Sequence, residues 1–147
     1  MKVTSRGYGE IEISERQVIQ FPVGLFGFEH LHSYALLDAA QPPFYWLQSI
    51  EDSELAFVMI NPYDLRPDYV LDVPGEDLDA IQFEDDKDIL VFAIVTIPED
   101  RSQTSANLQG PVLINRVHQL GCQSISLNPA WKTKHLFAEE LRGVRRT

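Results

Sequence analysis

The sequence lacks several features that would each point to a particular class of protein. Only one of its 147 residues, Cys122, is a cysteine, so an internal disulfide is impossible, and such a composition is typical of a reducing compartment. The longest apolar run, 89–97, is far too short to span a bilayer. The N-terminal six residues lack the apolar run of a signal peptide. We therefore expect a cytoplasmic protein without a membrane segment.

Basic residues are also scarce. Twelve lysines and arginines face 22 acidic residues, which gives a net charge of −10. This balance argues against direct nucleic-acid binding, which requires many cations to neutralise phosphates, and it favours a basic protein partner. Residues 132–147 differ, because their five basic and two acidic residues sum to +3. This C-terminal stretch, with Lys132 and Lys134 at its start, is either a solvated tail or a docking element.

No set of residues with catalytic or metal-binding spacing occurs. The acidic stretch 84–88 lacks the alternating ligands and central glycine of an EF-hand, so we expect a solvated turn. The four histidines are scattered, without a CxxC or HExxH partner, and no G-x-S-x-G elbow or phosphate-binding loop is present. We expect no metal and no cofactor.

Cys122 with His118 is the one pair that could act as nucleophile and base. The surrounding sequence has a strand-and-turn pattern, so a buried, inert thiol is the preferred interpretation and an enzyme stays an alternative.

Most of the chain is predicted to form short strands punctuated by proline and glycine. The predicted strands are 10–13, 18–21, 34–37, 44–50, 56–60, 69–73, 89–97, 112–114 and 124–127. Helices are predicted at 76–81, which has acids in its first turn, and at 135–141, with a single turn at 27–31. We expect a mainly β fold, a single-domain antiparallel barrel-like or strongly bent sheet with one or two short helices. The domain would cover 1–142, with a loose basic tail at 143–147.

Two segments, 21–29 and 104–115, combine apolar residues with glycine, proline and asparagine. Neither carries a nucleophile, base or metal set, so both are predicted to hold an unusual backbone shape. The glycines would allow positive φ or close backbone approach, the prolines would end strands or lie at sheet edges, and an asparagine would bond to a turn. The motif residues are Phe21, Pro22, Gly24, Gly27, Asn107, Pro111 and Asn115.

These segments carry a resemblance to a known family. Ile19-x-Phe21-Pro22-x-Gly24-Leu25-x-Gly27-Phe28-Glu29, then Pro43-Phe44-x-Trp46-Leu47-Gln48-Ser49, then Thr104-x-Ala106-Asn107-Leu108-x-x-Pro111-Val112-x-Ile114-Asn115, resemble the bacterial flagellar assembly factor family FliW. The resemblance runs from Val3 to His135, in the correct order of motifs.

The resemblance implies a non-enzymatic protein with two partners. Members of this family bind flagellin in the cytoplasm, and they bind the translational repressor CsrA, which otherwise blocks flagellin translation. The expected mechanism is a partner switch, in which flagellin and CsrA compete for the factor.

For flagellin, we expect an apolar terminal helix in a groove or along a sheet edge. Candidate partner-binding residues are Phe26, Phe28, Phe44, Tyr45 and Tyr63, together with Lys132 and Lys134. The alternative from another class is a small-ligand-binding β-barrel, which would require a cavity lined by several polar groups.

Overall fold

The computed structural model describes residues 1–140. The predicted tail at 143–147 and the last residue of the predicted helix at 135–141 lie outside these described residues. The strands are β1 (Lys2–Ser5), β2 (Gly9–Glu12), β3 (Val18–Gln20), β4 (Ser33–Asp38), β5 (Phe44–Ser49), β6 (Ala56–Ile60), β7 (Ile89–Thr96), β8 (Ser105–Asn115), β9 (Leu120–Gln123) and β10 (His135–Leu136). The helices are α1 (Pro62–Leu65) and α2 (Gly75–Ala80), with single 3-10 turns at η1 (Glu15–Gln17), η2 (Asp86–Asp88) and η3 (Arg101–Gln103).

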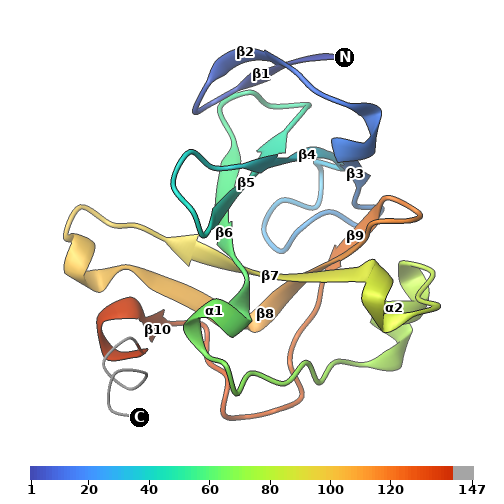
Figure 1. The fold of residues 1–147 in the computed structure, drawn as a ribbon. Coiled ribbons are helices and arrows are strands. Elements are labelled where there is room, and N and C mark those ends of the chain that lie inside the picture. Colours follow the sequence, from blue (N-terminus) through green and yellow to red (C-terminus); the bar gives the residue numbers. More distant parts are fainter. Residues whose placement is uncertain (141–147) are drawn as a thin grey trace.

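Strands β3 to β9 close into a seven-stranded barrel (Figure 1). Each strand from β3 to β8 pairs antiparallel with the next, and β8 also pairs with β9. A short parallel contact between Gln20 of β3 and Leu120 of β9 completes the ring. The prediction of a mainly β, barrel-like fold is confirmed, and the one parallel contact makes the barrel mixed.

The barrel interior is filled by large apolar side chains. Ile19, Phe21, Leu25, Leu31, Tyr34, Leu47, Met59, Phe92, Val112 and Ile114 form its central cluster. The rings of Phe21 and Tyr34 meet edge to face at 5.2 Å, a favoured aromatic geometry. This packing leaves no polar interior of the kind that a ligand-binding barrel would require.

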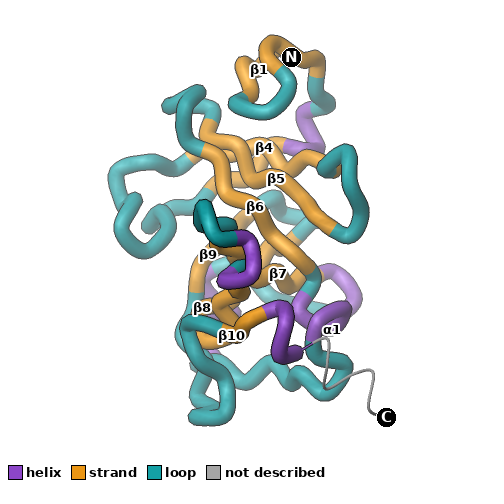
Figure 2. The backbone as a smooth tube through the Cα atoms, turned by 90° about the vertical axis from the view of Figure 1, so that its left-hand side faces the viewer, coloured by secondary structure: helices purple, strands orange, loops and turns teal. Residues whose placement is uncertain are grey.

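The N-terminal hairpin packs against the outside of the barrel. β1 and β2 form a separate two-stranded sheet, seen at the top of Figures 1 and 2. The hairpin and the segment after it contribute Val3 and Ile13 to a cluster with Ala35 and Leu37 of β4, which covers the outer face of that strand. The sequence analysis predicted β2 but missed β1.

Strand β7 is paired differently along its length. On one side it pairs with β8 from Ile89 to Thr96, with a register shift between Phe92 and Ile94. On the other side it pairs with β6 only from Ala93 to Val95. The chain leaves β6 at Asn61, whose side chain caps α1, and Pro62 occupies the first turn of that helix, so β6 ends there. The first half of β7, Ile89–Phe92, therefore has one edge with no neighbouring strand from the described part of the chain.

Three predicted elements need correction. Residues 69–73 belong to no strand, because no strand in residues 1–140 pairs with them. The last strand of the barrel is 120–123 rather than 124–127, where the serines are buried and Ile125 and Leu127 are exposed. His135 and Leu136 form β10 on the edge of β8, and helical geometry begins only at Phe137.

Candidate functional site

The aromatic residues predicted to form one groove are distributed over three places. Tyr45 and Tyr63 line one cavity, and Phe44 lines another. Phe28 packs edge to face on Phe57 at 5.2 Å, and Phe26 beside it is about half exposed, at 52%. The five candidates therefore do not make a common surface.

Lys132 and Lys134 contribute to neither cavity. Both side chains are exposed, and among the described residues neither forms an ion pair. The backbone of Lys132 has a structural role. Its carbonyl accepts hydrogen bonds from the backbone N–H groups of Leu108 and Gln109, both at 3.1 Å. These contacts hold the segment before β10 against β8.

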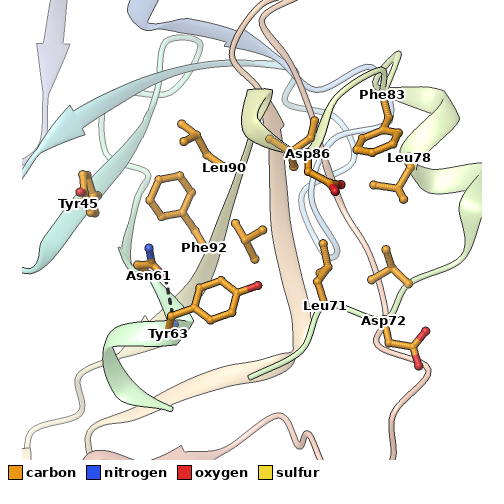
Figure 3. Close-up of a pocket in the computed structure, with 13 residues that line it drawn as sticks. Tyr45, Asn61, Tyr63, Leu71, Asp72, Leu78, Phe83, Asp86, Leu90 and Phe92 are labelled. Atoms are coloured by element: carbon orange, nitrogen blue, oxygen red, sulfur yellow. Dashed lines mark hydrogen bonds between the residues drawn. The ribbon is translucent and has the colours of Figure 1, made fainter. Parts of the chain in front are cut away.

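The cavity lined by Tyr45 and Tyr63 lies along the unpaired half of β7, and we call it the β7 groove. It has a volume of about 560 Å³, within the range of 300–1,000 Å³ usual for binding pockets. Figure 3 shows the rings of Tyr45 and Phe92 on one side of the β7 groove and the side chains of Leu78 and Phe83 on the other. Its full lining is Tyr45, Asn61, Tyr63, Leu71, Asp72, Val73, Leu78, Phe83, Asp86, Ile89, Leu90, Val91 and Phe92.

Four consecutive residues of β7, Ile89 to Phe92, all line the β7 groove. Side chains of a strand point alternately to opposite faces, so a cavity over one face would meet only every second residue. Contact with all four means that the strand edge, with its backbone, faces the cavity. This agrees with the pairing pattern, in which β6 accompanies β7 only from Ala93 onwards.

Helix α1 supplies one wall of the β7 groove. The Asn61 side chain accepts a hydrogen bond from the backbone N–H of Tyr63 at 3.0 Å, which fixes the start of the helix and the position of the Tyr63 ring. That ring packs edge to face against Tyr69 at 5.7 Å, and Tyr69 is itself buried. The Tyr69 hydroxyl donates to the carbonyl of Leu108 at 3.1 Å, and burial raises the pKa of Tyr69 to about 12. The wall is thus anchored to β8.

A charged cluster supports the same wall from behind. Arg66, at the end of α1, makes two hydrogen bonds of 2.8 Å to the Asp68 carboxylate and one of 3.1 Å to Glu140. Its guanidinium lies 5.0 Å from the ring centre of Trp131. The hydrogen bond to Asp68 raises the pKa of Arg66 and lowers that of Asp68. Glu140 in turn bonds to Nδ1 of the buried His135 at 2.8 Å, so α1 and the C-terminal segment are tied together.

An acidic segment of the chain contributes to the lining of the β7 groove. Residues 72–88 contain eight acidic residues and one lysine, so they carry −7 of the chain's net charge of −10. Asp72 and Asp86 line the β7 groove directly, and their carboxylates make no hydrogen bond or ion pair within the described residues. The sequence analysis took 84–88 only as a solvated turn, and the high density of acids from Asp72 onwards was the signal that it did not use.

A second cavity lies elsewhere on the barrel. Its volume is about 570 Å³, and it is lined mainly by apolar residues that include Phe44, Trp46, Ile97 and Phe137. The rings of Phe44 and Phe137 stack almost in parallel, with centres 6.2 Å apart. Of the described residues that line this cavity, none is acidic and Arg101 is the charged one.

The motif residues hold backbone turns. Gly24 and Gly27 have φ angles of +70° and +86°, which favour glycine. A Cβ at Gly24 would lie 2.6 Å from the backbone of Glu29, so this position also requires close approach. Pro22 begins this turn directly after Phe21, whose side chain is fully buried in the barrel.

The second motif acts through its asparagines. The Asn107 side chain accepts from the backbone N–H groups of Gln109 and Gly110, at 3.1 and 2.8 Å, where β8 changes register. Asn115 accepts from the turn at Val117 and His118 and donates to the carbonyl of Ile81 at 2.8 Å, which connects the β8–β9 turn to the end of α2.

The remaining motif residue, Pro111, lies inside β8 and does not end it, in the part of the strand where the pairing with β7 changes register. Pro111 is buried, and its carbonyl accepts from Ser124 N–H at 2.9 Å. The sequence analysis missed Gly121, where a Cβ would lie 2.5 Å from the Phe21 ring.

The thiol and imidazole considered as a catalytic pair have different partners. Cys122 is buried beside the carbonyl of Asp77, at 3.7 Å, and burial raises its pKa to about 12. His118 lies on the surface, where its Nε2 is 3.2 Å from Glu84. In the described part of the chain, no group of three or more His, Cys, Asp or Glu residues is placed to hold a metal ion.

The helices found among residues 1–140 include none that is long and apolar enough to cross a membrane.

Comparison with known proteins identifies the relatives of this chain. The family model described as "FliW protein" matches residues 2–137. The flagellar assembly factor FliW of Treponema denticola is 44% identical over 146 residues, which cover 99% of each chain. That of Caldicellulosiruptor saccharolyticus is 41% identical over 139 residues, 95% of this chain and 91% of the relative. A crystal structure of the flagellar assembly factor FliW superposes with a TM-score of 0.85 at 34% identity, over 93% of this chain and 96% of the other.

Proposed function

The chain belongs to the FliW family of flagellar assembly factors, and from this premise we propose that it switches between two protein partners in the cytoplasm. One partner is flagellin, and the other is CsrA, the RNA-binding repressor of flagellin translation. Flagellin that has not been exported occupies the factor and leaves CsrA free to repress. Export of flagellin releases the factor, which then binds CsrA and relieves repression. Similarity to flagellar assembly factors over nearly the whole chain is the observation that carries this proposal.

The distribution of charge supports the CsrA half of the proposal. A protein that holds RNA must present basic residues to the phosphates, so its surface is attracted to an acidic body. This chain has a net charge of −10, most of which comes from residues 72–88. Opposite charges speed the encounter of two proteins and disfavour wrong partners.

Membership in this family also makes the protein a non-enzymatic assembly factor. Its output is therefore a pair of relative affinities rather than a turnover rate. For a switch, binding of flagellin must lower the affinity for CsrA, and by linkage CsrA must lower the affinity for flagellin by the same factor. The two effects can be measured independently and must agree.

The test is isothermal titration calorimetry with flagellin and CsrA from the same organism, first separately and then in competition. We expect binding to both, and a CsrA affinity that falls when the protein is first saturated with flagellin. The reverse titration, flagellin into the CsrA complex, should give the same factor. Binding to flagellin alone would remove the translational role. Binding to neither would overturn the proposal.

A further inference from the structure

We propose that the β7 groove takes up an extended, cationic segment of a partner protein, which adds as a strand to the free edge of β7. The inference rests on the proposed function in one respect, namely that the partner carrying this segment is the basic regulator, CsrA, and not flagellin. It assigns the segment to a defined surface of the chain.

The first argument is the strand edge itself. Ile89–Phe92 pair with β8 on one side and, within residues 1–140, with no strand on the other. Backbone N–H and C=O groups at such an edge form a template for another strand. An extended segment satisfies these groups and its own at once, which is how sheet edges bind peptides in other proteins. A helix already uses its backbone groups internally and would leave the edge unpaired.

The second argument is the apolar lining and the volume of the β7 groove. Apolar side chains from β5, β7 and α2, such as Tyr45, Phe92 and Leu78, surround the edge (Figure 3). Alternate side chains of an added strand point to the same face, about 6–7 Å apart. A volume of about 560 Å³ holds a few such side chains. The segment is therefore expected to be apolar at every second position.

The third argument is charge. The carboxylates of Asp72 and Asp86 line the β7 groove and are unpaired within the described residues. They belong to the stretch 72–88, whose net charge is −7. An acidic segment would be repelled here, whereas lysine or arginine at the polar positions of the strand would be attracted. This complementarity favours the cationic partner over any other occupant.

Hydrogen–deuterium exchange of the full chain tests where the segment binds. Four additions are compared: CsrA, flagellin, a seven-residue peptide of alternating valine and lysine, and the same peptide with glutamate in place of lysine. We expect slower exchange in 89–92 with CsrA and with the lysine peptide, because their backbones would pair with this edge. Flagellin and the glutamate peptide should leave 89–92 unchanged.

Charge variants provide a second, independent readout. The double variant D72N/D86N removes two exposed carboxylates from the β7 groove without changing side-chain size. The control D38N/E99Q removes two exposed carboxylates outside its lining. We expect CsrA affinity to fall roughly tenfold at low salt in D72N/D86N and to change less than about twofold in the control. The difference should shrink as salt is raised, since salt screens exposed charges.

The outcomes separate this inference from the partner switch. CsrA binding without protection of 89–92 would overturn the groove assignment and leave the switch intact. Protection by the lysine peptide when neither protein binds would support the groove and overturn the switch. Protection of 89–92 by flagellin instead of CsrA would assign the edge to flagellin and overturn the inference. The variant R145S/R146S removes two charges from the basic C-terminal stretch. Protection of 89–92 in the free chain that is lost in this variant would assign the edge to that stretch and would also overturn the inference.

Discussion

The barrel interior and the β7 groove share three side chains, Tyr45, Leu90 and Phe92, and the ring centres of Tyr45 and Phe92 lie 5.1 Å apart. On the interior side these rings meet a filled apolar core. On the groove side they meet an open strand edge and an acidic segment of the chain. The same kinds of residue thus give either stability or a binding surface, and the difference lies in where β6 stops pairing. Substitutions in the two regions should therefore affect different measurements.

The largest expected effect tests the interior. Phe21→Ala removes a fully buried ring and should lower the free energy of unfolding by about 3–5 kcal/mol, because it creates a cavity that the barrel cannot close. Phe26→Ala is the matched control, since Phe26 is 52% exposed in the neighbouring turn and should change stability by about 0.5 kcal/mol or less. Urea titrations monitored by circular dichroism measure the free energy of unfolding of both variants. Equal losses would contradict the assignment of Phe21 to the core.

The next effect separates two glycines in that same turn. Gly24→Ala should cost roughly 2–4 kcal/mol, because it combines a positive φ with a Cβ only 2.6 Å from backbone. Gly27→Ala meets nothing within 4 Å, so it should cost about 1–2 kcal/mol for its positive φ alone. The difference in urea midpoints measures the steric contribution. If both variants lose the same stability, the close approach at Gly24 is relieved at no cost.

The smallest effect compares one tyrosine from each region. Within the described residues, the hydroxyl of Tyr34 inside the barrel has no hydrogen-bond partner, whereas that of Tyr69 behind the β7 groove donates to Leu108. Tyr34→Phe should therefore be neutral or slightly stabilising, and Tyr69→Phe should cost about 1 kcal/mol. Thermal unfolding at pH 7 measures the stability of both variants. A loss in Tyr34→Phe equal to that in Tyr69→Phe would mean that the Tyr34 hydroxyl is satisfied.

The same groups predict how stability depends on alkaline pH. Burial raises the pKa of Tyr34, Tyr69 and Cys122 to about 12, from 10.0, 10.0 and 9.0. In this window the folded state binds more protons than the unfolded state, so stability falls as pH rises from about 9 to 12. Tyr34→Phe should reduce that fall, because one of the three groups is then absent. Urea midpoints between pH 8 and 11 check the sign, and a stability that rises with pH would contradict it.

Much of the barrel could be predicted from the sequence, because its strands alternate or are rich in β-branched and aromatic residues. Strand β6, for example, was predicted with the bounds that the structure has. The strand predictions fail where the pairing of one strand with another determines the structure. Residues 69–73 have strand composition, but no strand in residues 1–140 pairs with them, and Leu127 N–H bonds instead to the carbonyl of Asp72 at 2.7 Å. Local sequence does not report which backbone groups find partners.

The β7 groove was harder to predict than the fold. Tyr45 and Tyr63 were among the candidates, but Leu90 and Phe92 were taken only as members of the predicted strand 89–97. Their apolar side chains look the same in sequence whether the strand edge beside them is covered or open. The position at which β6 ends decides this, and it became visible only when the register between β6 and β7 was known.

The open edge of β7 also has a consequence for the chain at high concentration. Unpaired strand edges promote aggregation, because two copies of a protein can join their sheets edge to edge. Here such a contact would bring two stretches of net charge −7 against each other. Their mutual repulsion opposes that pairing, so the carboxylates beside the edge oppose aggregation of the protein.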